Sequence, residues 1–428
     1  MTEAEAVVKG RDADDACPGA LRPHHAADGE LLRLRVPGGV IAMTALRGLA
    51  AASQLLADGR IGVTSRGNLQ VRGVREGDVP ALVDRLRGVG LLPNAEHERV
   101  RNIVASPLSG RRAGSLDDVD PLVHDLDAAL CARPGLALLP GRFLFAVDDG
   151  SGDVVREGAD VLAVALGGGR FAVRPAGVAR GLGVEVEHVV AAMLAVAESF
   201  LAERATQDSR AWRIAELDGG GARLVEQLRA AGWPAEAERT GEADADEAER
   251  AGGPNLEPGL VEQRDGRLAV CALAPLGLLT ADQVAALVAG AELSSAPADG
   301  ARGALRITPW RRVLIRDLEV PAALAVRELL SSVGLLVEPG TAWSRVTACA
   351  GRPGCAKSLT DVHSDAQGFA AAADSAGPAV HWAGCERGCG TPSGRDVVRV
   401  LATTVGYRVE GGPFGLRDRA AAGLEVSA

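Results

Sequence analysis

The chain has 428 residues, a formal net charge of −10 and 47% hydrophobic residues, which suits two to four structural units with sizeable cores. The acidic balance argues against a protein that binds nucleic acid by general attraction to phosphates. Residues 1–16 show no leader pattern, and no continuous apolar stretch approaches about 18 residues. We therefore expect a cytoplasmic protein that does not cross a membrane.

Residues 31–41, "LLRLRVPGGVI", predict a strand that runs into a Pro-Gly-Gly turn. An Ala- and Leu-rich helix is expected over 44–59, a pair of strands over 61–74, and a second helix over 79–92. These elements indicate an α+β unit in the first part of the chain.

The next part of the chain is again rich in predicted strands. Residues 139–153 and 161–175 are expected to form antiparallel strands, and a long helical stretch is expected from about 187 to 231. Residues 234–257 are acidic, rich in Ala and Gly, and without apolar periodicity. We interpret that segment as a linker.

The order of elements in the first unit returns in residues 268–336. The string "VGLL" closes both segments, at 89–92 and 333–336, and Val63-Thr64 aligns with Ile307-Thr308. Chance similarity between two amphipathic segments would not explain both matches and the shared order. The sequence therefore predicts a duplicated α+β protein, whose two halves would leave a cleft suited to a large ligand.

Two cysteine pairs lie near the end of the chain, close to strands expected at 379–384 and 397–412. They form the pattern C-x5-C, a gap of 29 residues, then C-x3-C: Cys349, Cys355, Cys385 and Cys389. Thiolates are soft ligands for iron–sulfur clusters or zinc, and glycines beside both pairs would let the backbone approach a bulky cluster. We interpret the pattern as a [4Fe-4S] site, with zinc and unrelated buried thiols as alternatives.

The other three cysteines have no such partners, so we interpret them as small core residues or free thiols: Cys17, Cys131 and Cys271. The first half also carries four arginines at strand ends, namely Arg35, Arg66, Arg101 and Arg142. A single surface arginine is usually only solvated. Four in similar positions of an acidic chain indicate a site for a polyanion, because guanidinium groups bind carboxylates bidentately.

The cysteine spacing and the duplication resemble the siroheme-dependent sulfite and nitrite reductase family, from about residue 17 onward. The resemblance implies a [4Fe-4S] cluster on the four cysteines, with Cys389 also bridging to the siroheme iron. It implies a duplicated α+β fold of two pseudo-symmetric halves, each with a ferredoxin-like unit and a larger mixed-sheet unit. The expected domains are 25–100 and 258–338 (ferredoxin-like), 101–232 and 339–428 (larger α+β, the latter with the cysteines), joined by an acidic linker at 233–257.

The resemblance also assigns roles to individual residues. The string "TSRGNLQVRG" matches a tetrapyrrole-binding strand of that family, which implies ligand contacts from Arg66, Asn68, Gln70 and Arg72. The basic residues that face the family's small anionic substrate, and take part in catalysis, match Arg35, Arg101 and Arg142. Two positions depart from the reductase pattern: Leu144 stands where a second lysine is usual, and Arg387 replaces the asparagine of "C-P-N-G-C".

The chain resembles more closely the precorrin-3B synthases, the cobalamin-pathway branch of the same superfamily. The matching strings are "ACPGALRPHHAADGELLRLRVPGG", "VTSRGNLQVRG", "LPGRFLFAVDDG" and "HWAGCERGCGTP", and a basic residue at the Arg387 position is typical of that branch. The implied activity is an oxygen-dependent hydroxylation of precorrin-3A at C20, with closure of a γ-lactone. A former siroheme pocket would then hold a tetrapyrrole substrate, which Arg387 would also contact.

The partners expected from this resemblance are precorrin-3A, dioxygen, and NADH-derived electrons delivered by a separate reductase or by NADH itself. Siroheme and a mononuclear non-haem iron stay open as further cofactors. The histidines considered for such an iron are His24, His25, His363 and His381, although each is more simply read as solvated or hydrogen-bonded. A siroheme-dependent sulfite or nitrite reductase is the alternative function, and a non-catalytic tetrapyrrole or iron–sulfur carrier is a weaker one.

Overall fold

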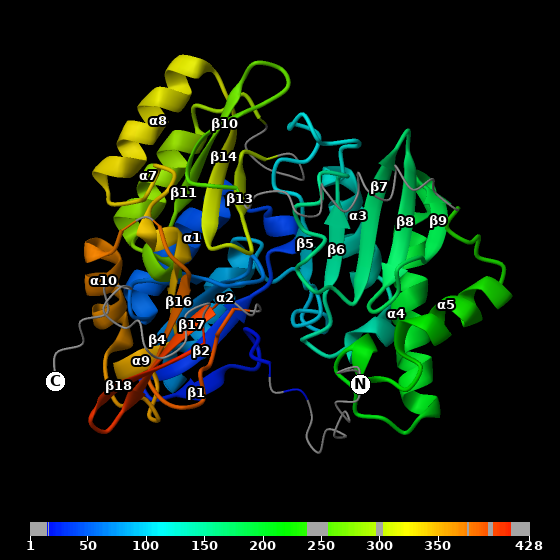
Figure 1. Cartoon of the computed structure of the whole chain (residues 1–428), viewed down its shortest axis with the longest axis horizontal. Helices are drawn as coiled ribbons and strands as arrows, with labels where there is room; N and C mark the ends of the chain where they lie inside the picture. The colour runs from blue at the N-terminus through cyan, green and yellow to red at the C-terminus, as the bar shows by residue number, and fades with distance from the viewer. Residues whose placement is uncertain are drawn as a thin grey trace.

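The computed structural model describes residues 15, 17–237, 256–296, 303–374, 376–392 and 397–411. Four sheets make up the fold, and Figure 1 shows how they are arranged. The first has the order β1-β2-β4-β3-β12. Its elements are β1 (His24–Ala26), β2 (Gly29–Leu34), α1 (Met43–Leu56), β3 (Ile61–Val63), β4 (Leu69–Val74), α2 (Val79–Gly88) and, from the second half, β12 (Leu278–Leu279).

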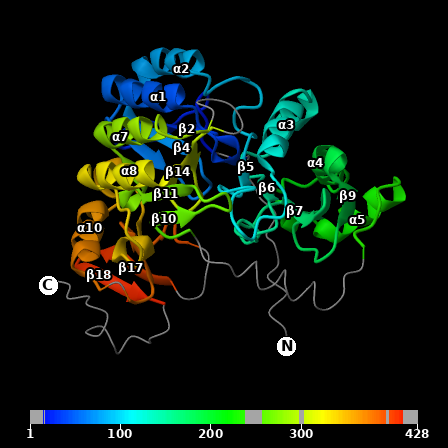
Figure 2. The same cartoon turned by 90° about the horizontal axis from the view of Figure 1, so that it is seen from above.

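The second sheet has the order β10-β11-β14-β13 and repeats this plan. Its elements are β10 (Gly259–Glu262), β11 (Leu268–Leu273), α7 (Ala281–Ala291), β13 (Leu305–Ile307), β14 (Arg312–Leu318) and α8 (Val320–Ser332). A capping box at Thr280 and Gln283 satisfies backbone donors at the start of α7. Helices α1, α2, α7 and α8 lie side by side in Figure 2, and residues of both halves share one hydrophobic core.

The two halves exchange backbone contacts reciprocally. A short 3₁₀ turn follows β2 in the first half and β11 in the second, at η1 (Pro37–Gly39) and η6 (Pro275–Gly277). The residue after η6, Leu278, pairs with Gly62, and the residue after η1, Val40, bridges to Arg306. Under the alignment of Val63 with Ile307, Gly62 corresponds to Arg306, so the two bridges are pseudo-symmetric copies of each other.

A third sheet, with the order β5-β6-β7-β8-β9, forms the body of what we call the first α+β unit. Its elements are β5 (Ile103–Ala105), α3 (Asp120–Cys131), η3 (Pro134–Leu138), β6 (Phe145–Asp148), β7 (Val161–Gly167), β8 (Arg170–Pro175), β9 (Leu182–Glu185), η4 (Val186–His188), α4 (Val189–Thr206), η5 (Ile214–Glu216) and α5 (Gly220–Ala230). Residues of α3, α4 and α5 share a second core with the strands.

Two expectations for this unit were wrong. Strands β6 and β7 pair in parallel, and only the β7–β8 pair is the expected antiparallel hairpin. The helical stretch expected from 187 to 231 is two helices, because the chain leaves α4 at Gln207 and Asp208 takes a left-handed φ of 47°. The segment between the helices is compact, since Ile214 and Leu217 are buried in the same core.

The fourth sheet carries the cysteines, and we call its region the cysteine unit. Its strands have the order β15-β16-β17-β18. Its elements are η7 (Ala342–Arg345), β15 (Val346–Ala348), α9 (Gly351–Gly354), α10 (Val362–Ala372), β16 (Ala379–Ala383), β17 (Val397–Thr403) and β18 (Gly406–Glu410). Two parallel pairs are followed by an antiparallel pair, as in β5 to β8, so the duplication extends to the larger sheets.

Part of the expected acidic linker lies outside the described residues, at 238–255. Its described start is packed, because Ala235 bridges to Leu182 and Glu236 forms an ion pair with Arg174. A remaining short element is η2 (Glu76–Asp78), which leads into α2. Among the described residues, no helix is both long enough and apolar enough to span a membrane.

Candidate functional site

The four expected cluster cysteines lie on two adjacent loops that follow parallel strands. We call these the cysteine loops, residues 349–359 after β15 and 384–390 after β16. The backbone N–H of Leu359 donates to the carbonyl of Gly384 at 2.8 Å, and the N–H of Gly384 donates to Sγ of Cys349 at 3.2 Å. A Cβ at Gly384 would lie 1.8 Å from Oγ of Ser358. Only glycine therefore lets the loops approach this closely.

The arrangement of the thiols suits a bulky anionic cluster. Burial raises the pKa of Cys349, the N–H groups of Gly384 and Gly351 oppose that shift, and the charges of Cys355 and Cys389 add to it. Backbone N–H groups at a cysteine sulfur are the contacts that stabilise iron–sulfur clusters. Three of the thiols are half-buried and Cys389 is exposed. These residues fit a [4Fe-4S] cluster, in which Cys349, Cys355, Cys385 and Cys389 would be the ligands.

A single metal ion finds less support. Within the described part of the chain, no three His, Cys, Asp or Glu side chains are grouped closely enough to hold one ion. A four-iron cluster spreads its thiolates over a larger body than one ion does, so this finding bears on the zinc alternative and on the mononuclear iron rather than on the cluster.

The histidines considered for an iron lie in different surroundings. His381 is fully buried: its Nε2–H donates to the carbonyl of Cys389 at 3.1 Å, and Nδ1 bonds to the hydroxyl of Thr347 at 2.8 Å. Burial lowers the pKa of His381 to about 4, so the ring is neutral and both nitrogens are engaged. His24 and His25 lie on β1, where His25 forms a pair with Glu30 at 2.7 Å. His363, on α10, keeps a buried Nδ1 without a hydrogen-bond partner.

Three of the predicted arginines come together with a fourth that the sequence did not single out. Nη1 of Arg66 donates to the carbonyl of Arg142 at 3.0 Å. Burial lowers the pKa of Arg66 to about 10, and the charges of Arg213, Arg35 and Arg142 add to that shift. We call Arg35, Arg66, Arg142 and Arg213 the arginine group. Within the part of the chain that the structure describes, Arg213 alone among these four forms an ion pair, with Asp160 at 2.7 Å.

The excess of positive charge in this group would favour an anionic ligand. Arg35 is 4% exposed, and its donors reach the carbonyls of Arg99 and Gly141 at 3.0 and 3.2 Å rather than a carboxylate. Arg142 is exposed and lies over the ring of Trp212 at 5.3 Å. A ligand with several carboxylates could pair with guanidinium groups that the protein leaves unneutralised.

The other predicted tetrapyrrole contacts have mixed surroundings. Asn68 is buried, and it accepts from the N–H of Val36 and donates to Asn102, so its amide holds the strands together. Gln70 lies over Gly62, because a Cβ added at Gly62 would be only 2.7 Å from Cγ of Gln70. Arg72 pairs bidentately with Asp28, at 3.1 Å for both contacts, and donates to the carbonyl of Gly354 in a cysteine loop at 2.6 Å.

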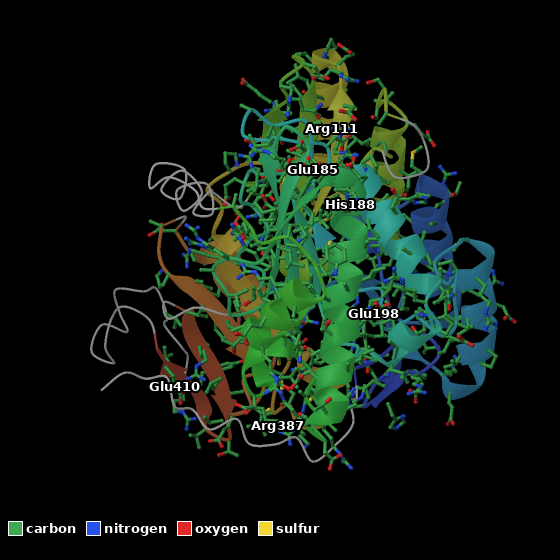
Figure 3. All side chains as sticks on the ribbon, turned by 90° about the vertical axis from the view of Figure 1, so that its right-hand side faces the viewer. Arg111, Glu185, His188, Glu198, Arg387 and Glu410 are labelled. Atoms are coloured by element: carbon green, nitrogen blue, oxygen red, sulfur yellow. The ribbon has the colours of Figure 1, made fainter. Side chains whose placement is uncertain are left out.

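Arg387 and Arg101 are not members of the arginine group. Arg387 is exposed on a cysteine loop, and Figure 3 places it at the opposite end of the molecule from Arg111. Arg101 is buried and pairs bidentately with Asp127 of α3 at 2.7 and 2.6 Å. Because its guanidinium is already paired, Arg101 has surroundings that differ from the substrate-facing position implied by the resemblance.

Leu144 lies in an apolar cluster on the sheet face away from the α3–α5 core. It is 1% exposed and packs with Val104, Ala146 and the partly buried Ala159 and Leu162. Its backbone N–H donates to the buried carboxylate of Asp160 at 2.9 Å. The same carboxylate oxygen also pairs with Nε of Arg213 at 2.7 Å.

The three remaining cysteines have separate environments. Burial raises the pKa of Cys271 to about 12, as expected for a core thiol, and Cys131 is half-buried beside Arg101. Sγ of Cys17 lies 3.8 Å from nitrogens of both Arg33 and Arg35.

The sequence reasoning missed the second half's counterpart of the "TSRGN" turn. We call Thr64–Asn68 the first tip and Thr308–Arg312 the second tip, since each joins a pair of corresponding strands. In both, the third residue reaches the first α+β unit: Arg66 contacts Arg142, and Nε1 of Trp310 donates to Glu157 at 2.9 Å. The aligned Val63-Thr64 and Ile307-Thr308 were the signal that could have identified it.

Comparisons with known proteins show what this chain is similar to. The family described as nitrite/sulfite reductase ferredoxin-like half domain matches residues 22–89. Ferredoxin–nitrite reductase of Synechococcus elongatus is 28% identical in an alignment of 400 residues that covers 86% of this chain and 75% of that protein. Precorrin-3B synthase of a Sinorhizobium species is 24% identical in an alignment of 420 residues that covers 94% of this chain and 84% of that protein.

The solved structure of the Mycobacterium tuberculosis NirA protein matches with a TM-score of 0.64 and 20% identity, over 91% of this chain and 75% of that one. The chain is a relative of the nitrite and sulfite reductases. The expected duplicated α+β, nitrite/sulfite reductase-like fold is confirmed. These relatives include both a ferredoxin–nitrite reductase and a precorrin-3B synthase.

Proposed function

We propose that this nitrite/sulfite reductase relative is a precorrin-3B synthase, which hydroxylates precorrin-3A at C20 and closes the ring A acetate onto C1 as a γ-lactone. One oxygen atom of dioxygen enters the product. The other leaves as water, with two electrons and two protons from a donor such as NADH or a separate reductase.

The observation that carries the proposal is the surroundings of Leu144. Where the reductase pattern has a second lysine, this chain has a buried leucine among Val104 and Ala146. Reduction of sulfite or nitrite needs cationic groups and proton donors that converge on a small anion. An alkyl side chain supplies neither, whereas an apolar wall suits oxidation of a carbon atom because it limits stray proton delivery.

The arginine group supports a carboxylated tetrapyrrole as the ligand. Arg66 and Arg142 would bind acetate or propionate groups by charge-assisted hydrogen bonds, and Arg35 would hold the strand end beneath them through the carbonyls of Arg99 and Gly141. Arg72 would keep the first sheet in contact with the cysteine loop at Gly354. When bound, a [4Fe-4S] cluster on the four cysteines would supply electrons one at a time.

The test is turnover of precorrin-3A by anaerobically purified protein that is then given a reductant and labelled dioxygen. We expect a product heavier by one oxygen atom, with the label in the new hydroxyl group. Reduced viologen with sulfite or nitrite should give little turnover. Rapid formation of sulfide or ammonia, with precorrin-3A unchanged, would contradict the proposal.

A siroheme-dependent nitrite or sulfite reductase is the second candidate. It is favoured by the 28% identity to ferredoxin–nitrite reductase and by the retained Arg35, Arg66 and Arg142. The absorption spectrum of the purified protein distinguishes the two, because siroheme adds strong bands that a cluster alone lacks. Cofactor extraction that yields siroheme in equal amount to protein would favour the reductase.

A further inference from the structure

Arg311, in the second tip, is held in an unusual backbone conformation. Its φ is 60°, and the corresponding residue of the first tip is Gly67, with φ 63°. A left-handed conformation is unfavourable for a residue other than glycine. The N–H of Arg311 donates to Thr308 and its carbonyl accepts from Ala274, so the surrounding structure fixes this conformation.

The side chain of Arg311 lies against the turn η6. Its stem crosses Gly277, where a Cβ would meet Cδ of Arg311 at 2.7 Å. The preceding residue, Leu276, is buried in the core of the cysteine unit with Val346 and Val362, and Cys349 packs against that core. Arg311 therefore lies against the turn η6, which packs on the cysteine unit through Leu276.

Among the described residues, the guanidinium of Arg311 has no hydrogen bond and no ion pair. Burial lowers its pKa, and no acidic group opposes the shift. The neighbouring Arg312 and Arg316 differ, because they pair with Glu257 and Asp120. Burial and the charge of Arg311 both lower the pKa of His363 and of His381. His381 in turn donates to the carbonyl of Cys389.

We propose that Arg311 supplies the counter-charge for the [4Fe-4S] cluster on Cys349, Cys355, Cys385 and Cys389, and thereby raises its reduction potential. This inference rests on the cluster of the proposed function. Four thiolates outweigh the positive charge of the iron–sulfide core, so the bound cluster is anionic, and it becomes more so when it accepts one electron from a donor. A buried cation nearby stabilises the reduced form more than the oxidised one.

The experiment is a redox titration of the full chain, purified anaerobically with its cluster and reduced stepwise with dithionite. The signal is the electron paramagnetic resonance of the reduced cluster. We expect Arg311→Gln to shift the potential to a more negative value and Arg311→Lys to keep it close to that of the unsubstituted protein. The control is Arg133→Gln, which removes an arginine charge from the first α+β unit, where Arg133 pairs with Glu198. That control should leave the potential unchanged.

Several outcomes decide the matter. If Arg311→Gln holds a full cluster at an unchanged potential, the inference is overturned. It is also overturned if the only effect of that variant is weaker binding of a carboxylated porphyrin. If Arg311→Gln loses iron and sulfide while Arg311→Lys retains them, the counter-charge is supported. Loss of the cluster from both variants would overturn it. A protein that reduces sulfite but shows the expected shift would contradict the proposed function and leave this inference standing.

Discussion

Arg66 and Arg101 both stand at strand ends of the first half, yet their surroundings differ. Arg66 lies in the arginine group, where burial and three other guanidinium groups lower its pKa to about 10. Arg101 is paired bidentately with Asp127. The same residue type therefore has an unneutralised charge available for a ligand in one place, and a structural ion pair in the other.

We expect Arg66→Ala to weaken binding of a carboxylated tetrapyrrole more than tenfold, since a hydrogen bond to a charged group contributes about 1.5–3 kcal/mol. Fluorescence titration with a carboxylated porphyrin measures this change. The unfolding midpoint in urea should move little, because Arg66 has no acidic partner to leave unpaired. Unaltered affinity would place the ligand elsewhere.

Arg101→Ala should act in the opposite way. It leaves the carboxylate of Asp127 unpaired, which costs about 1–3 kcal/mol of unfolding free energy, measured by urea unfolding. Porphyrin affinity should change much less than in Arg66→Ala. The double variant Arg101→Ala/Asp127→Ala should recover part of the stability, because neither charge is then left alone. A large loss of affinity at unchanged stability would support the substrate-facing role instead.

The cysteines likewise divide into four expected cluster ligands and three that have other surroundings. Cys349→Ser or Cys385→Ser should abolish the visible absorption of the cluster and reduce its iron and sulfide content, because each removes one of four soft ligands. Cys131→Ser is the matched control, since Cys131 lies on α3 and should leave the cluster intact. Full cluster retention in Cys385→Ser would refute the assignment.

At the scale of elements, the junction between the two ferredoxin-like halves depends on glycines in the 3₁₀ turns. Gly39 has φ 69°, and a Cβ there would lie 1.9 Å from the carbonyl oxygen of Ile307. Gly277 occupies the corresponding place in the other half, with φ 75° and the carbonyl oxygen of Val63 at 3.0 Å from a Cβ. Both turns therefore approach the opposite half closely, and at Gly39 the approach is too close for a side chain.

Gly39→Ala should destabilise the protein by more than about 4 kcal/mol, the range reached only by severe defects. Gly59→Ala is the matched control, because its φ of 80° imposes the same backbone strain while nothing lies within 4 Å of a Cβ. That control should cost only about 1–2 kcal/mol. Urea unfolding compares the two variants, and equal losses would show that contact between the halves is not what constrains Gly39.

At the scale of the whole molecule, a buried charge network joins the second ferredoxin-like half to the first α+β unit. Asp120, at the start of α3, accepts from Arg306 at 3.0 Å and Arg316 at 2.9 Å, both almost fully buried. Arg111 adds a contact to Asp120 and pairs with Asp317. Figure 3 shows Arg111 at the end of the molecule opposite Arg387, so this network holds the units together away from the cysteine loops.

Asp120→Asn should lower the free energy of unfolding by about 3–5 kcal/mol at neutral pH, because it leaves buried arginines without their shared carboxylate. Burial alone would raise the pKa of Asp120, but Arg306 and Arg316 outweigh it and hold the pKa below the ordinary value of 3.8. Its stabilising contribution is therefore complete above 3.8 and is lost as pH falls through the lower folded-state pKa.

The stability difference between the unsubstituted protein and Asp120→Asn should accordingly be largest at neutral pH and shrink below pH 3.8. Urea unfolding over a series of pH values measures it. A difference that stays constant, or that grows in acid, would contradict the assignment of Asp120 as the ionised centre of this network.

The local elements could be predicted from the sequence because their signals are local. The helix expected over 44–59 is α1 at Met43–Leu56, and the strand pair over 61–74 is β3 and β4. The cysteine spacing likewise identified two neighbouring loops. The β6–β7 pairing could not be predicted in this way, because two strands in sequence can pair in parallel or antiparallel, depending on the intervening chain and the sheet.

The sequence by itself determined the duplication, the α+β class and the cysteine loops, since each depends on repeated order, periodicity or spacing along the chain. Only the tertiary structure decided which arginines are free for a ligand. Burial and pairing depend on residues far apart in sequence: Arg101 meets Asp127, while Arg66 meets Arg142 and Arg213. Arg311 likewise gains its place beside the cysteine unit only when the second tip packs against Leu276 and Gly277, a contact that no local pattern encodes.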